Sequence, residues 1–252
     1  MNLYSPATSK RASFAAFPAL FLVLVLATAA FTQQRVSRHY PAGKNVRIEL
    51  KNLSGTITVE TWARDEIRIT ATMEAPAVHF NPRQTDAGLV VDIVGDNRDR
   101  RDVGDVNFKI QVPSRSSVDL ETRSGQISVS NIQGDLVRAH VWTSGDITLS
   151  GVNAARVFAS NTTGNIYFDG ELHDGGAYSF QSMKGDLDIT LPSGTPFNLN
   201  ARALSENINL GSFVNSLTGS SRGPKGIAGT HLKGGPRLTL TSYAGRILLH
   251  KK

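Results

Sequence analysis

Five polar residues follow the turns of an internal repeat, and their side-chain oxygens are the atoms in this chain best suited to bind a metal cation. They are Gln126, Asp146, Asn165, Asp186 and Asn207. If the turns stack, these side chains form a ladder, and Ca²⁺ prefers oxygen ligands. Asp and Asn also cap turns by accepting hydrogen bonds from backbone N–H groups. Because the calcium-binding repeat Gly-Gly-x-Gly-x-Asp is absent, we expect turn capping, with no metal site and no cofactor.

The other residue types that could do chemistry are scattered along the chain. The six histidines have no spacing typical of metal ligands, and spacing alone places none of them beside a serine such as Ser144. An enzyme would need carboxylates and Lys or Arg gathered in one groove with long loops around it. Four aromatic residues could stack on sugar rings if exposed, although core packing is their commoner fate: Trp62, Trp142, Tyr167 and Tyr178. We therefore predict no catalytic residues and no enzyme.

An internal repeat defines the elements that must position these residues. Two alternating apolar residues precede a Gly, and two more lie at the second and fourth positions after it. The spacing is identical in five copies, which contain Gly55, Gly125, Gly164, Gly185 and Gly245. Such alternation is typical of strands with one buried face. Each copy therefore predicts a strand, a glycine corner and a second strand.

Two further copies depart from the repeat. Around Gly145 the preceding apolar residues lie one position early, which predicts a β-bulge near Trp142 or Thr143. In the next to last copy Glu206 occupies the glycine position. The corner there is therefore expected either to lack a positive φ or to be strained.

The spacing of the turns predicts how the strands stack. Turn positions 125, 145, 164, 185 and 206 are about 20 residues apart, and 245 follows after close to two periods. A chain that climbs one strand spacing per coil places equivalent residues directly above one another. We expect an all-β fold, with a parallel single-stranded β-solenoid of the β-helix type over residues 116–252. An antiparallel sandwich is the rival, because it uses the same alternation.

Two regions interrupt the regular spacing. Residues 31–115 contain strands separated by longer polar connections, which predicts an irregular N-terminal β cap over the open edge of the solenoid. Residues 211–236 contain seven Gly together with Ser and Pro. That composition predicts a mobile surface loop.

The first 30 residues follow the order of an export signal. Lys10 and Arg11 precede an apolar stretch at 14–26, and Ala27, Thr28 and Ala29 have the small-residue spacing of a signal-peptidase site. We expect a signal peptide over residues 1–30, with a membrane anchor through residues 12–30 as the alternative. The expected location is the periplasm or the cell surface.

Charge gives little reason to expect a nucleic-acid partner. The net charge is +6, and the arginines at 98, 100 and 101 alternate with aspartates at 96, 99 and 102, which is typical of a solvated loop. The chain has no Cys, so neither a disulfide nor a lipid attachment to Cys is available. The expected partner is an envelope protein or a polysaccharide whose identity the sequence does not give.

The repeat motifs resemble those of the bacterial putative-adhesin domain family of unknown function, which comprises β-strand-repeat-containing envelope proteins. The motifs are Ser124-Gly125-Gln126-Ile127, Ser144-Gly145-Asp146-Ile147, Thr163-Gly164-Asn165-Ile166 and Lys184-Gly185-Asp186-Leu187. The segments 62–67 and 110–113 are also similar, and the resemblance covers about residues 40–250. It implies an exported or membrane-anchored β-solenoid assigned to adhesion, with no catalytic residues to carry over.

Repeated polar corners and the family resemblance together favour a non-catalytic binding, adhesin-like or scaffolding role at the cell envelope. The alternative is a glycan-processing lyase or hydrolase built on the same β-helix. A groove that gathers two or more carboxylates with a Lys or Arg would favour the enzyme. Evenly spaced polar ladders would favour binding.

Overall fold

The computed structural model describes residue 1 and residues 33–252. Apart from Met1, the expected export segment at residues 1–30 lies outside the described residues. Strands dominate residues 33–252, and the exceptions there are a four-residue helix, α1 (Ile93–Asp96), and a 3-10 helix, η1 (Gly211–Ser216). In that part of the chain no helix is long and apolar enough to cross a membrane. The all-β prediction is confirmed.

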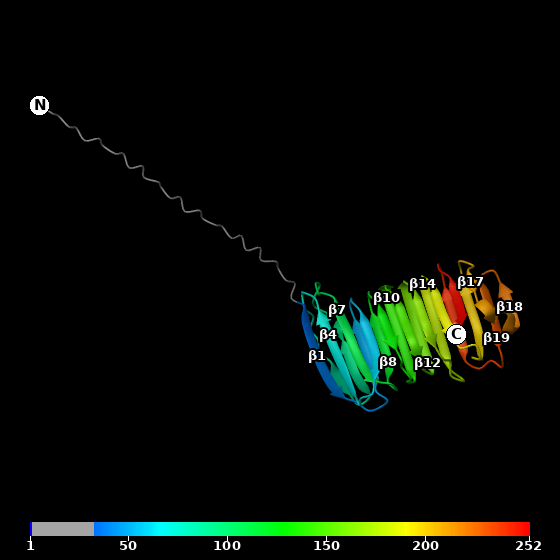
Figure 1. Ribbon diagram of the computed structural model, residues 1–252, viewed down its shortest axis with the longest axis horizontal. Helices are drawn as coiled ribbons and strands as arrows, with labels where there is room; N and C mark the ends of the chain where they lie inside the picture. The colour runs from blue at the N-terminus through cyan, green and yellow to red at the C-terminus, as the bar shows by residue number, and fades with distance from the viewer. Residues whose placement is uncertain (2–32) are drawn as a thin grey trace. The chain divides into compact units, whose positions relative to one another are not determined.

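The strands form two sheets that lie face to face (Figure 1). Sheet A has the spatial order β1 (Gln34–Pro41), β4 (Glu66–Met73), β7 (Val106–Pro113), β3 (Ile57–Trp62), β9 (Ile127–Ser130), β11 (Ile147–Val152), β13 (Ile166–Gly170), β15 (Leu187–Leu191), β21 (Ile247–Lys251) and β17 (Ile208–Asn209). Sheet B has the order β18 (Leu217–Gly223), β19 (Gly226–His231), β16 (Phe197–Ala203), β20 (Arg237–Ser242), β14 (Ala177–Lys184), β12 (Arg156–Thr163), β10 (Leu136–Ser144), β8 (Ser117–Thr122), β2 (Arg47–Asn52), β6 (Gly88–Asp92) and β5 (Arg83–Thr85).

The central strands of both sheets pair in parallel, as expected for stacked coils. Each coil contributes one strand to sheet B and the next strand to sheet A, so equivalent residues of successive coils are register partners. Ile147 pairs with Ile127 on one side and with Ile166 on the other, and Ile166 pairs in turn with Leu187. The outer strands are different, because β1, β4, β5, β18 and β19 each pair antiparallel with a neighbour. Both sheets are therefore mixed in strand direction.

The core lies between the two sheets. Alternating residues of every central strand point inward. Because inward residues of adjacent strands are register partners, each sheet contributes a column of fully buried side chains to the core. The sheet A column contains Ile57, Ile127, Ile147, Ile166, Leu187 and Ile247. The sheet B column opposite contains Ile48, Val118, Val137, Val157, Tyr178 and Leu238.

The corner between the sheets requires glycine because the coils approach closely there. A Cβ built on Gly185 would lie 1.8 Å from the carbonyl oxygen of Gly164, and one built on Gly145 would lie 1.9 Å from that of Gly125. Any side chain would therefore push adjacent coils apart. The sequence pattern that places Gly at this position in six copies is thus explained by stacking itself.

Both predicted departures from the repeat are visible in the structure. The register between β10 and β12 shifts between Val141 and Ser144, which confirms the bulge. Glu206 has φ +63, so the second expected form, a strained corner, is the one adopted. The N–H of Glu206 donates to the carbonyl of Ala203 in its own coil, which closes the turn.

The regular stack begins earlier than the sequence predicts. Strands β2 and β3 form a coil that pairs in parallel with β8 and β9, with Ile48 opposite Val118 and Ile57 opposite Ile127. Only the strands beyond this coil, together with α1, cover the N-terminal end. The repeat at Gly55 was recognised in the sequence, but it was assigned to the cap because longer polar connections separate it from the next copy at Gly125.

The order of the coils differs from the order of the sequence at the other end. Strands β20 and β21 insert between the β14–β15 coil and the β16–β17 coil, so Leu238 pairs with both Tyr178 and Leu199. The spacing of about two periods before position 245 is therefore not a skipped coil in a linear stack. Ile208 lies beyond Ile247 and is only partly buried, unlike its predicted place within the buried column.

The segment 211–236 is structured, contrary to the expectation of a mobile loop. It contains η1 and then a hairpin of β18 and β19, and β19 pairs antiparallel with β16. Its glycines suit a hairpin whose outer strand is exposed. The hairpin covers the edge of β16, which would otherwise present unpaired backbone groups.

Candidate functional site

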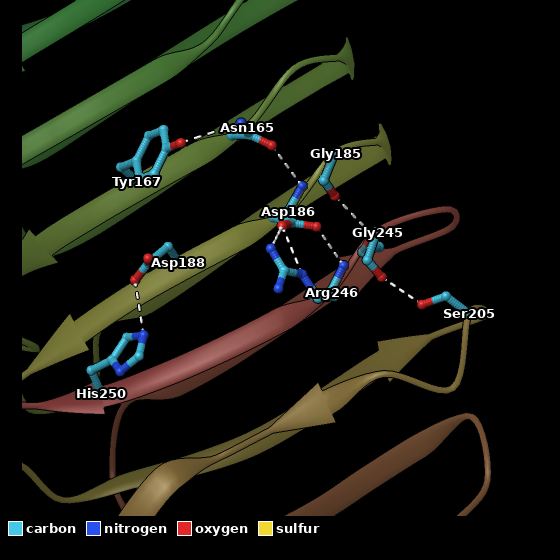
Figure 2. A network of polar contacts seen from close by, with 10 residues as sticks. Asn165, Tyr167, Gly185, Asp186, Asp188, Ser205, Gly245, Arg246 and His250 are labelled. Carbon is cyan, nitrogen blue, oxygen red and sulfur yellow. Dashed lines mark hydrogen bonds and ion pairs between the residues drawn. The ribbon is translucent and has the colours of Figure 1, made fainter.

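The polar ladder at the corner forms, and it bonds one coil to the next (Figure 2). The backbone N–H of Asn165 donates to Asp146 Oδ1 at 2.7 Å. That of Asp186 donates to Asn165 Oδ1 at 2.9 Å, and that of Arg246 donates to Asp186 Oδ1 at 2.8 Å. Each side chain therefore satisfies a backbone donor of the adjacent coil.

The order within this ladder follows the stack rather than the sequence. Arg246, from the inserted coil, occupies the place after Asp186 that the sequence order gives to Asn207 (Figure 2). Its Nε and Nη2 donate to Asp186 Oδ2 at 2.9 and 2.6 Å. These side-chain hydrogen bonds lower the pKa of Asp186 from its ordinary value, and the same contact raises the pKa of Arg246.

The ladder oxygens thus have partners within the fold. Asp146, Asn165 and Asp186 accept from backbone N–H groups, and Asp186 also pairs with a guanidinium. Within the described residues, no three histidine or acidic side chains are grouped as a metal site requires. The arrangement matches the turn-capping interpretation of these residues.

The bulge in β10 produces a different kind of site on the outer face of sheet B. A groove with a volume of about 620 Å³ lies between the ends of β2, β8 and β10 and the segment around α1. The side chains that can recognise a ligand there are Lys51, Asn52, Arg98, Glu121, Arg123 and Trp142. A space of this size suits a ligand of one to a few rings.

Trp142 is presented to solvent on a fixed support. It is 59% exposed, and its ring packs edge-on against His140 with centroids 4.4 Å apart. The bulge is held from both sides, because Thr143 donates from its N–H and its hydroxyl to the carbonyl of Arg123. On the other side the hydroxyl of Thr162 donates to the carbonyl of Trp142 at 2.7 Å.

The groove is lined by three cationic side chains, from Lys51, Arg98 and Arg123, and by two carboxylates, from Asp92 and Glu121. Asp92 accepts from the N–H of Gly95 at 2.7 Å and caps α1. Lys51 lies 3.7 Å from Glu49 outside the groove. No ion pair within the described residues involves Arg98 or Arg123, and the three cations of the lining exceed its two carboxylates by one charge.

Asn52 lies at the base of the groove with its side chain buried. The residue is only 1% exposed, and its Nδ2 donates to the carbonyls of Ser54 and Val106 at 2.8 and 2.9 Å. These two bonds set the orientation of the amide. Its Oδ1 has no hydrogen-bond partner among the described residues.

A row of three residues beside the groove brings a serine, a histidine and a carboxylate onto adjacent strands. Glu121, His140 and Ser160 are register partners, and Ser160 Oγ lies 2.6 Å from His140 Nδ1. Burial lowers the pKa of His140, against smaller raising effects of Glu121 and Ser160. Sequence reasoning missed this row. The repeat could have revealed it, because residues one period apart lie side by side on adjacent strands.

The row lacks two parts of a hydrolytic site. His140 Nε2 has no hydrogen-bond partner among the described residues, so Glu121 does not orient the ring. The surrounding backbone N–H groups lie within parallel strands, where they bond to neighbouring carbonyls instead of pointing toward an oxyanion. The arrangement therefore does not activate Ser160 by the triad geometry.

The remaining aromatic candidates are used within the fold to different degrees. Trp62 donates from Nε1 to the carbonyl of Glu66 and lies under the guanidinium groups of Arg64 and Arg68. Tyr178 is buried, and its hydroxyl donates to the carbonyl of Ala154 at 2.7 Å. Tyr167 is 40% exposed, but on sheet A, away from the groove.

The segment 219–223 matches the pattern Gly-x-Ser-x-Gly, with Ser221 at the central position. It lies in β18, an exposed strand at the edge of sheet B. A nucleophile elbow requires a sharp turn from a strand to a helix. The match therefore has no catalytic context.

Comparison with known proteins agrees with the architecture. Residues 41–233 match the family model of Toastrack DUF4097. The solved structure of a putative cell adhesion protein from Clostridium sporogenes ATCC 15579 is similar with a TM-score of 0.52 at 11% identity, over 88% of this chain and 100% of that one. A putative adhesin from Bacteroides fragilis NCTC 9343 aligns with a TM-score of 0.30 at 11% identity, over 88% and 99%. Comparison with curated proteins finds no match.

Proposed function

The chain belongs to the Toastrack DUF4097 family, and from that premise we propose that it is a non-catalytic binding protein of the cell envelope with an adhesin-like or scaffolding role. The observation that carries the proposal is the groove at Trp142, where a large aromatic ring beside a bulge is exposed next to Arg98 and Arg123. Exposed aromatic rings backed by a rigid support are typical of binding surfaces.

Exposed apolar side chains lie on four of the five coils that run from the groove, and we call them the apolar rim. The exception is the β12 coil, where Thr162 stands between Trp142 and Met183. The rim consists of Trp142, Met183, Tyr243 and Leu204, which are 59%, 43%, 40% and 40% exposed. The last three directly follow the register partners Ser182, Ser242 and Ala203, so they lie on adjacent coils. Apolar surface gathered in one place on a soluble protein indicates an interaction site.

Spacing along the rim favours an extended ligand. Successive coils are ~4.8 Å apart, so Met183, Tyr243 and Leu204 offer contacts one coil apart, and Trp142 lies two coils from Met183. A polymer lying along it could make many weak contacts in series. A polysaccharide or an extended protein segment at the envelope fits this arrangement.

The proposed location outside the cytoplasm rests on the N-terminal sequence and on the fold. Residues 1–30 have the charge, hydropathy and small-residue order of an export signal. The C. sporogenes protein that shares the fold is called a putative cell adhesion protein. Fractionation of cells followed by N-terminal sequencing tests this part, because an intact Met1 in the cytosol would contradict export.

The rival function is a glycan-processing enzyme, and specific features favour it enough to require a test. The groove holds Glu121 and Asp92 together with Lys51 and two arginines, and His140 bonds to Ser160 nearby. Against it, Asp92 caps α1 and His140 Nε2 is unpaired. A general acid and base must be free to reach the substrate.

A retention and cleavage assay separates the two functions. The full chain, recovered from its cell fraction, is incubated with cell-wall and surface-glycan preparations, and both bound protein and released fragments are measured. We expect retention without cleavage. Turnover of a glycan that disappears in Glu121→Gln would establish the enzyme instead, and absence of retention on every preparation would overturn the binding role.

A further inference from the structure

We propose that the groove at Trp142 binds an acidic polysaccharide, with one sugar ring stacked on Trp142 and the carboxylate of a sugar unit paired with Arg123 and Arg98. This inference rests on the proposed binding function and names the class of its ligand. It is carried by the exposed and supported ring of Trp142 and by Arg98 and Arg123 in the same groove.

The indole ring is prepared for stacking before any ligand arrives. Its edge-on contact with His140 and the hydrogen bonds on both sides of the bulge restrict its rotation. A ring that is already ordered loses little conformational entropy on binding. Its exposed face is apolar and broad, which suits the C–H face of a pyranose ring.

The charges around the ring select an anionic sugar. Arg123, Arg98 and Lys51 line the same groove, and Asp92 is engaged as the cap of α1. Guanidinium groups bind carboxylates by paired hydrogen bonds. Placing such a carboxylate beside Trp142 would also offset the repulsion between the two arginines.

The apolar rim favours a polymer over a single sugar. Met183, Tyr243 and Leu204 extend the contact surface beyond the groove across further coils. Their side chains can cover the apolar faces of successive sugar units at the ~4.8 Å spacing of the strands. Longer chains should therefore bind more tightly than single sugar units, through several linked contacts.

Affinity electrophoresis of the full chain through gels containing one polysaccharide each tests the proposal. The acidic probes are polygalacturonate, alginate and hyaluronan, and the matched neutral probes are the same polymers after reduction of their carboxyl groups. We expect retardation by at least one acidic polymer, about tenfold weaker binding to its reduced form, and weaker binding at higher salt. Failure of all three acidic polymers to retard the protein would overturn the inference.

Variants locate the binding to the groove. Trp142→Ala and Arg123→Gln should each weaken binding to the acidic polymer by roughly tenfold, while their thermal unfolding stays unchanged. Tyr167→Ala is the matched control, since Tyr167 is a partly exposed aromatic residue on sheet A. Equal losses in Tyr167→Ala and Trp142→Ala, or no loss in Trp142→Ala, would overturn the inference.

Two further arms separate this inference from the proposed function. Retention on cell-wall preparations that is unaffected by Trp142→Ala would leave a binding function but refute the groove as its site. Sedimentation with phosphatidylglycerol vesicles, abolished by Trp142→Ala while acidic polysaccharides do not bind, would assign the groove to lipid headgroups and overturn the sugar assignment. No retention on any preparation would overturn both.

Discussion

The corner at Asp186 and the corner at Trp142 have the same origin in the repeat but opposite character. At Asp186 the oxygens of the side chain accept from the backbone and the guanidinium of Arg246. At Trp142 one additional residue interrupts the register, the ring is 59% exposed, and Arg98 and Arg123 beside it have no ion-pair partner in the described chain. In this molecule, regular positions hold the coils together, and the break in the repeat is available for a ligand.

The comparison shows why repeated polar residues are a poor guide to binding in a stacked fold. A residue that recurs in every coil meets its own equivalents above and below, and its hydrogen bonds are used between coils. A residue that interrupts the repeat has no equivalent to pair with. Four changes test this distinction, in order of expected effect on the free energy of unfolding.

The largest effect is expected from Gly185→Ala at a regular corner. The new methyl group would lie 1.8 Å from the carbonyl oxygen of Gly164, so adjacent coils must separate. We expect a loss of roughly 1–3 kcal/mol from overpacking, measured by denaturant unfolding. Gly194→Ala is the control, because nothing lies within 4 Å of its added Cβ. Equal stability of the two variants would contradict the close-approach explanation.

A smaller effect of opposite sign is expected from Glu206→Gly. Glu206 has φ +63, a conformation that costs a non-glycine residue about 1 kcal/mol. Restoring the glycine of the other corners should therefore raise the free energy of unfolding by up to about 1 kcal/mol. Chemical denaturation measures the change. A decrease would show that the Glu206 side chain makes a contact worth more than the strain.

Deleting Thr143 sharpens the comparison at the bulge itself. The deletion gives β10 the same spacing before its glycine as β12 and β14. It removes two hydrogen bonds to the carbonyl of Arg123 but makes the parallel register continuous, so we expect a change in stability within about 1 kcal/mol. Thermal unfolding measures stability, and retention on the acidic polymer measures binding. Unchanged binding would show that the bulge is dispensable.

The smallest effect concerns acid stability and Asp186. Because its folded pKa is lowered by Arg246, its contribution is present above the unfolded pKa near 3.8 and is lost as the pH falls through the lower folded pKa. Asp186→Asn should therefore unfold with a flatter pH dependence below about pH 4 than the parent chain. Denaturant unfolding at several acidic pH values measures this. An identical slope in both proteins would show that the pair with Arg246 does not persist in solution.

The repeat allowed the central coils to be predicted because each residue there has one dominant role. The column through Ile127, Ile147 and Ile166 and the bulge at Trp142 follow from spacing alone. The prediction was wrong at 211–236, where glycine content suggested a mobile loop but the unpaired edge of β16 supplies backbone partners for a hairpin. Composition describes a segment in isolation, and an edge strand is a property of its surroundings.

The candidate site was only partly predictable for a similar reason. Trp142 was among the aromatic residues considered and the bulge was expected beside it, but core packing was the expected fate of its ring, which is 59% exposed. The approach of Asn52, Arg98 and Arg123 to that ring was not predictable. These residues come from separate coils and from the segment after α1, and their meeting depends on how the N-terminal strands fold over β2.

The insertion of β20 and β21 has a consequence for the order of folding. The β16–β17 coil and its hairpin are synthesised before the strands that separate them from β14 and β15. Until β20 arrives, β16 could pair with β14 instead, since the two would be neighbours in a simple linear stack. Growth of this end therefore cannot follow synthesis residue by residue, and it requires pairing between residues 60 positions apart in the chain, such as Tyr178 and Leu238. We expect completion of this end to be the slowest step of folding.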